Sequence, residues 1–130
     1  MTTFLDSIQS PCQTISGSGA QASTVSGGTI VLTSATATNL TIPAPKAGGP
    51  RTPGQPVPSP TAISNENGQD GQELSIMSTT AAAHTVTAGN NKINGNKTTA
   101  TFAAAIGNNL KLKAYGGVWY QQPSSGITLS

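Results

Sequence analysis

The sequence predicts an all-β protein: an antiparallel β-sandwich or barrel of seven to nine short strands, with an extended N-terminal arm and a Pro-rich loop. Three observations lead to this fold class. Short segments alternate apolar and polar residues with the two-residue period of a strand. Turn-forming Gly, Asn and Asp residues recur at close intervals between these segments. Convincing helical periodicity is found nowhere, although the Ala-rich segment 99–106 could form one helical turn.

Length and composition indicate one domain with a thin core. Leu, Ile, Val and Phe together account for 23 of the 130 residues, and the formal net charge is only +2. Low net charge argues against disorder, and Thr, Ala, Ser, Gly and Asn fill the place of bulky apolar residues. Because so small a domain buries little surface alone, we expect oligomerisation, with identical copies sharing a hydrophobic interior.

Residues 1–28 are expected to form an extended arm. Apolar residues are scattered among Ser, Gln, Thr and Gly, and the second half of the segment has the composition of a linker. Two alternatives stay open: a frayed terminus, or an arm that becomes ordered on a neighbouring subunit. In the second case Phe4, Leu5 and Ile8 are its anchors.

Residues 29–130 are expected to form the β domain, which a Pro-rich loop at 43–60 interrupts. Residues 29–33 and 39–42 are short strand candidates, and Pro43 ends the second. Seven of the nine prolines then fall within 43–60. Proline offers no N–H to a sheet, so this segment must be a long surface loop with polyproline-II character. Loops of this length are usually functional or linkers.

The second half of the chain supplies further strand candidates at 73–78, 84–87 and 98–103, and a last one through Ile127 and Leu129. Asn94-Gly95 is a strong hairpin signal between them.

The clearest hairpin lies at 106–121. Leu110, Leu112 and Ala114 alternate with two lysines, Gly116-Gly117 permits a tight turn, and Val-Trp-Tyr returns the chain. We expect Leu110, Leu112, Trp119 and Tyr120 to take part in core or subunit packing. Because Trp119 and Tyr120 are adjacent on one strand, one of them must face inward and the other outward.

Residues that could carry chemistry are few. His84 is the only histidine, and a hydrogen-bonded structural role is favoured over a metal ligand or a general base. Glu66, Asp70 and Glu73 fall within eight residues, but their spacing matches no calcium loop, and turn formation is favoured. Cys12 has no basic neighbour and is expected to be inert. We therefore predict no enzymatic activity, no metal and no cofactor.

The sequence also argues against several partners. Six basic residues are spread along the chain without a cluster, so a nucleic-acid interface is not expected. The longest apolar runs fall far short of a membrane span, and the N-terminus does not resemble a secretion signal. We expect a soluble protein made in the cytoplasm.

Three segments carry a resemblance to a known group: T-I-V-L-T-S-A-T-A-T-N-L-T-I-P-A-P at 29–45, D-G-Q-E-L-S-I-M-S-T-T-A-A-A-H-T-V-T at 70–87, and G-N-N-L-K-L-K-A-Y-G-G-V-W-Y at 107–120. Together they resemble small virion proteins of tailed bacteriophages, over roughly residues 28–122. The resemblance extends to capsid decoration (cement) proteins and to head-fibre and tail-fibre modules. The Pro-rich loop is not part of it.

The resemblance implies a structural, commonly trimeric, all-β protein on the exterior of a capsid in the virion, made in the host cytoplasm. Its partners would be the major capsid protein and its own copies in a homotrimer, which bridges neighbouring capsomers through the arm. An alternative is a receptor- or glycan-binding module of a tail fibre or baseplate, with Trp119, Tyr115 and the 65–73 turn as its contact surface. A small hydrolase is a third class, for which one His and four carboxylates give no convergent acid–base site.

Overall fold

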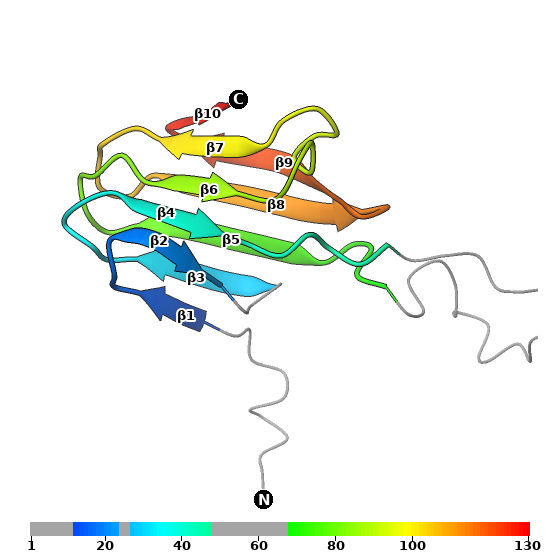
Figure 1. Ribbon diagram of the computed structural model, residues 1–130, viewed down its shortest axis with the longest axis horizontal. Coiled ribbons are helices and arrows are strands. Elements are labelled where there is room, and N and C mark those ends of the chain that lie inside the picture. The colour runs from blue at the N-terminus through cyan, green and yellow to red at the C-terminus, as the bar shows by residue number, and fades with distance from the viewer. Residues whose placement is uncertain (1–11, 24–26, 48–67) are drawn as a thin grey trace, which may run out of the picture.

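The computed structural model describes residues 12–23, 27–47 and 68–130, which fold into two stacked β-sheets (Figure 1). The described residues contain ten strands and no helix, so the all-β fold class and the sandwich are confirmed. The strands are β1 (Cys12–Ile15), β2 (Gly19–Ala22), β3 (Gly28–Leu32), β4 (Thr38–Thr41), β5 (Glu73–Ser78), β6 (Thr85–Thr87), β7 (Thr99–Phe102), β8 (Asn109–Tyr115), β9 (Val118–Ser125) and β10 (Ile127–Leu129). Sheet A has the order β1-β3-β5-β8-β9, and sheet B the order β10-β7-β6-β4-β2.

The first six strands alternate between the two sheets, so the chain winds as three successive coils. Each coil contributes one strand to sheet A and one to sheet B: β1 and β2, then β3 and β4, then β5 and β6. Strands that neighbour each other in this half of a sheet are therefore parallel: β1 with β3, β3 with β5, β2 with β4 and β4 with β6. The prediction of an antiparallel sandwich is wrong for this half, because the apolar–polar alternation of a strand carries no information on its direction.

The second and third coils are structural repeats. Ile30 pairs with Ile76 in sheet A and Asn39 pairs with Thr85 in sheet B, an offset of 46 residues in both sheets. Segments 29–42 and 75–88 therefore match without insertion or deletion. The first coil is two residues shorter at its corner, since its offset to the second is 17 residues in sheet A and 19 in sheet B.

The last four strands are antiparallel and complete the sandwich. The 106–121 hairpin is confirmed, with β8 and β9 joined at Gly116 and Gly117, whose φ angles are 61° and 81°. Two consecutive positive φ angles define the type I′ turn that Gly-Gly favours. Ile127 and Leu129 form the predicted last strand, β10, which pairs with β7.

The core lies between the two sheets of a single chain. Its largest fully buried side chains are Trp119, Phe102, Ile30, Leu32, Leu40, Leu74, Ile76, Ile93, Leu110, Leu112, His84 and Val86. Alternate strand residues of both sheets supply all of these side chains except His84 and Ile93, which lie outside the strands. The expectation that copies must share a hydrophobic interior is therefore not met, because one chain closes its own core.

The predicted arm does not extend over 1–28. Cys12–Ile15 and Gly19–Ala22 form β1 and β2, and Gly28 already belongs to β3. The linker-like composition was misleading because β2 is held by backbone pairing to β4 and needs no bulky side chain. Residues 1–11, including Phe4, Leu5 and Ile8, lie outside the described residues.

The Pro-rich loop leaves and rejoins the sandwich between the second and third coils. Residues 42–47 have no regular structure, and residues 48–60 lie outside the described part of the chain. Two hydrogen bonds clasp the stem of this excursion: Gln69 N–H donates to the Lys46 carbonyl at 2.8 Å, and Lys46 N–H donates to Gln69 Oε1 at 2.7 Å.

Candidate functional site

The predicted packing residues divide between the interior and the surface. Leu110, Leu112 and Trp119 point into the core and are at most 1% exposed. Tyr120 points outward with 40% of its surface exposed, and Tyr115 is 64% exposed. The expected division between Trp119 and Tyr120 is thus confirmed, and Trp119 is removed from any surface contact site.

Trp119 joins the hairpin to two loops. Its indole N–H donates to the Pro43 carbonyl at 3.0 Å, where the Pro-rich loop begins. Its backbone N–H donates to the Lys92 carbonyl at 2.8 Å, and its carbonyl accepts the Asn94 N–H at 2.8 Å. Trp119 is therefore a structural anchor that holds the 92–94 loop through its backbone and the start of the Pro-rich loop through its indole.

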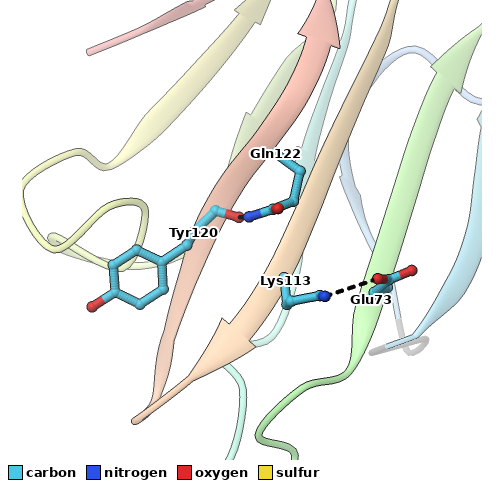
Figure 2. A network of polar contacts seen from close by, with 4 residues as sticks. All are labelled: Glu73, Lys113, Tyr120 and Gln122. Atoms are coloured by element: carbon cyan, nitrogen blue, oxygen red, sulfur yellow. Dashed lines mark hydrogen bonds and ion pairs between the residues drawn. The ribbon is translucent and has the colours of Figure 1, made fainter.

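The outer face of sheet A carries aromatic and charged side chains (Figure 2). Lys113 Nζ lies 3.2 Å from Glu73 Oε2 across β8 and β5, and Tyr120 stands opposite Lys113 on β9. The side chains of this ion pair are 47% and 71% exposed, so solvent screens it and it adds little stability. Tyr115 and Tyr120 occupy diagonal positions on this face, within reach of one aromatic or carbohydrate group.

The outer face of sheet B is different, because it is uncharged and rich in hydroxyl groups. Strand register places its outward residues in two rows across the five strands. The rows are Ala20, Asn39, Thr85, Thr101 and Thr128, and Ala22, Thr41, Thr87 and Thr99. We refer to these nine residues as the threonine face. Thr85 Oγ1 donates to Asn39 Oδ1 at 2.8 Å. The side chains of this face are short, and those of its threonines are restricted at χ1. This array follows only from the strand pairing, although the T-x-T triplets at 85–87 and 99–101 are visible in the sequence.

His84 is buried at the corner of the third coil, just before β6, with 0% exposure. Its Nδ1 accepts the Thr38 backbone N–H at 3.0 Å. Thr80 Oγ1 lies 3.1 Å from Nε2 and donates its single proton to the Ser34 carbonyl. The Nε2–H must therefore donate to Thr80, which fixes the neutral Nε2–H tautomer. Burial lowers the pKa of His84 below its ordinary value of 6.5.

This network confirms the structural interpretation of His84. Thr38 occupies the equivalent position in the second coil, and its hydroxyl donates to the Gly17 carbonyl of the first coil at 2.8 Å. Each corner thus contacts the coil before it. Phe102 packs edge-on against the imidazole, with ring centroids 6.3 Å apart.

The sequence favours turn formation for the carboxylates at 66–73, and the two that lie in the described residues, Asp70 and Glu73, have separate partners. Asp70 Oδ1 accepts the Gly116 N–H at 2.9 Å and so supports the β8–β9 turn, whereas Glu73 pairs with Lys113. Glu66 lies outside the described residues. Within 12–23, 27–47 and 68–130, His, Cys, Asp and Glu side chains form no group of three that could hold a metal ion. Cys12 is a free, exposed thiol on β1.

Helices able to cross a bilayer are absent from the described part of the chain. Comparison of the sequence with protein-family models and with curated proteins, and of the structure with solved structures, gives no significant match. The candidate binding surfaces therefore follow from this chain's own geometry: they are the outer faces of sheets A and B, which differ in chemistry.

Proposed function

We propose that this protein is a structural virion protein that decorates a bacteriophage capsid and stabilises the shell by bridging capsomers. The sequence resemblance to small virion proteins supports the proposal, and the β-sandwich is compatible with it. His84 and Asp70 make hydrogen bonds that hold coil corners and the β8–β9 turn, so their chemistry serves the fold.

The threonine face is the observation that carries the proposal. A surface without charged side chains contacts a large protein without desolvating a charge. Its β-branched residues have restricted χ1 rotamers, so little side-chain entropy is lost on binding. We assign this face to the major capsid protein, with residues 1–11 as an additional contact through Phe4, Leu5 and Ile8.

Stabilisation of the shell would then follow from mass action. A protein that binds only the assembled capsid lowers the free energy of that state, by about 2.7 kcal/mol per site at a free concentration one hundred times Kd. No catalytic step is required.

The test measures binding to undecorated capsids and the temperature at which they release DNA. Thr41→Lys with Thr101→Lys places two charges on the threonine face and should abolish both binding and protection. Ser75→Lys on the outer face of sheet A is the matched control and should preserve both. Deleting residues 1–11 removes the predicted anchors without removing β1 and should weaken binding. Full binding by the double lysine variant would contradict the assignment of this face, and a particle map without the protein on the capsid would contradict the function.

The exposed tyrosines favour a second candidate, a receptor- or glycan-binding module of a tail fibre or baseplate. Tyr115 and Tyr120 lie diagonally on the outer face of sheet A beside Lys113. For this function, Tyr115→Ser with Tyr120→Ser should abolish adsorption to host cells and leave particle stability unchanged. Capsid decoration predicts unchanged adsorption in that variant, so one experiment separates the two functions.

A further inference from the structure

The two edge strands of sheet A, β9 and β1, differ in whether the backbone groups that point away from the sheet have partners in the described residues. On β9, the residues whose N–H would point away from the sheet are Trp119, Gln121 and Pro123. The Trp119 N–H donates to the Lys92 carbonyl, the Gln121 N–H donates to Asn94 Oδ1 at 2.9 Å, and proline has no N–H. Loop contacts and a proline are two recognised ways of blocking an edge from further strand pairing. The β9 edge is therefore closed.

Within the described residues, the opposite edge of sheet A, β1, has no such protection. The Ile15 carbonyl accepts the Thr33 N–H, so Ile15 and Gln13 direct their backbone groups towards β3. In a parallel pair the intervening residues point the other way, and these are Cys12 and Thr14. The described residues provide no partner strand on that side, and the strand sequence C-Q-T-I contains neither charge nor proline.

The edge of sheet B at the same end repeats this arrangement. The Gly19 N–H donates to the Ala37 carbonyl, which directs Ala20 and Ala22 away from β4. The strand sequence G-A-Q-A is again free of charge and proline. Figure 1 shows β1 and β2 together at one end of the sandwich, opposite β10 and β7. The β1 and β2 edges thus both belong to the first coil, and we refer to β1 and β2 together as the coil end.

Apart from Ile15, which is buried in the core, the inward-facing side chains of the coil end are polar. Gln13 and Gln21 occupy the positions that Ile30 and Leu40 hold in the second coil. The Ser23 hydroxyl donates to Gln13 Oε1 at 2.7 Å, and Gln21 Nε2 donates to the Ser18 carbonyl at 3.1 Å. Polar groups at this position keep the free coil end soluble, as terminal repeats of solenoids do. Association here would rest on backbone hydrogen bonds and amides, which gives a reversible contact.

We infer that the coil end is an interface between two copies of this chain, which join end to end through their β1 and β2 edges. Two open edges lie about 10 Å apart, the spacing of stacked sheets, and the end of another two-layer sandwich fills both at once, whereas one extended peptide fills only one. A two-fold axis gives a self-complementary contact with strands of the two copies antiparallel. Because neither strand is charged, identical ends meet without repulsion. The inference does not depend on the capsid proposal.

The test uses a proline at positions whose N–H points outward. Thr14→Pro with Ala20→Pro removes an outward donor from each edge and leaves the pairing to β3 and β4 intact, as Pro123 does on β9. Thr14→Val with Ala20→Val is the matched control, since it retains both N–H groups. Sedimentation equilibrium of the full chain should give a two-copy association for wild type and for the valine variant. The proline variant should weaken that association by at least about tenfold in Kd, since several backbone hydrogen bonds are lost across the axis.

Two further measurements test the interface independently, in case the proline variant does not fold. Thr14→Lys with Ala20→Lys leaves the backbone donors in place and brings like charges together across the axis, so dimerisation should weaken most at low salt. Pyrene attached to the exposed Cys12 should show excimer emission in wild type and lose it in the lysine variant, at unchanged circular dichroism. A wild-type chain that stays monomeric at high concentration would overturn the inference. A dimer or trimer that is indifferent to both the proline and the lysine variants would also overturn it, because its interface would lie elsewhere.

Discussion

Protonation of His84 should destabilise the fold, and the structure gives the direction of the effect. The imidazole is fully buried, its Nδ1 accepts the Thr38 N–H at 3.0 Å, and its Nε2–H donates to Thr80. A proton added at Nδ1 would face the Thr38 N–H and would be a buried charge. The pKa of His84 is therefore lower in the folded state than in the unfolded chain, where it is about 6.5.

The sign of the pH dependence follows from this difference. Below pH 6.5 the unfolded chain binds a proton that the folded chain does not, so the free energy of unfolding falls as pH falls. The loss is about 1.4 kcal/mol for each pH unit below the unfolded pKa, and it ends once the pH passes the folded pKa. Above pH 6.5 the contribution of His84 is constant. Because this is the only histidine, other groups contribute little between pH 6.5 and pH 5.

Urea denaturation from pH 7.5 to pH 5, followed by tryptophan fluorescence, measures this slope. His84→Asn is the comparison variant, since its Oδ1 can accept the Thr38 N–H and its amide does not titrate in this range. We expect the variant to be less stable at pH 7.5 because of the smaller side chain, yet nearly independent of pH. Equal slopes for wild type and His84→Asn between pH 6.5 and pH 5 would refute the assigned tautomer and the buried neutral ring.

Substitutions at three further positions test a core contact, a turn and an exposed ion pair. Trp119→Phe removes the indole donor to the Pro43 carbonyl and part of the buried ring volume. It should lower the free energy of unfolding by about 2 kcal/mol in urea titrations. An unchanged urea midpoint would show that this anchor is dispensable. Gly116→Ala should lower the free energy of unfolding by about 1 kcal/mol because the φ angle of Gly116 is 61°, and Gly116→Asn should lower it less. A Cβ at this position would meet no atom within 4 Å, so the loss would come from the backbone conformation. Equal losses of stability for both variants would contradict that origin. Lys113→Met should change stability by less than about 1 kcal/mol, since its ion pair with Glu73 is exposed, and a larger loss by thermal denaturation would show that the pair is not screened.

The sequence predicted the hairpin of β8 and β9 well because its information is local. Alternation placed Leu110 and Leu112 in the core, and Gly116-Gly117 specified the turn that joins the strands. Local signals of this kind survive in any sheet topology. The inward direction of Trp119 and the outward direction of Tyr120 follow from the same two-residue period.

The parallel coils could not be predicted in the same way, because strand direction depends on where the chain goes between strands. One signal was present: segments 29–42 and 75–88 match position by position, with Ile30 aligned to Ile76 and Leu40 to Val86. The segment between the two repeats, which includes the Pro-rich loop, separates them and obscures the period. β1 and β2 were missed because their residues are small and polar, and only the backbone of β3 and β4 makes them strands.

The threonine face, likewise, could not be predicted from single segments of the sequence. Thr41, Thr87 and Thr99 are far apart in the sequence and become neighbours only through the register of β4, β6 and β7. The role of Phe4, Leu5 and Ile8 as contact residues remains a prediction, as does the homotrimer.

The clasp between Lys46 and Gln69 separates the length of the Pro-rich segment from the geometry of the coils. Because Lys46 and Gln69 are hydrogen-bonded to each other, the two ends of the connection keep the same positions on the sandwich whatever peptide joins them. Doubling the length of a flexible connection costs only about 0.6 kcal/mol of closure entropy. The segment between residues 47 and 68 can therefore be replaced by another peptide, or by an inserted domain, without a change in the β-sandwich.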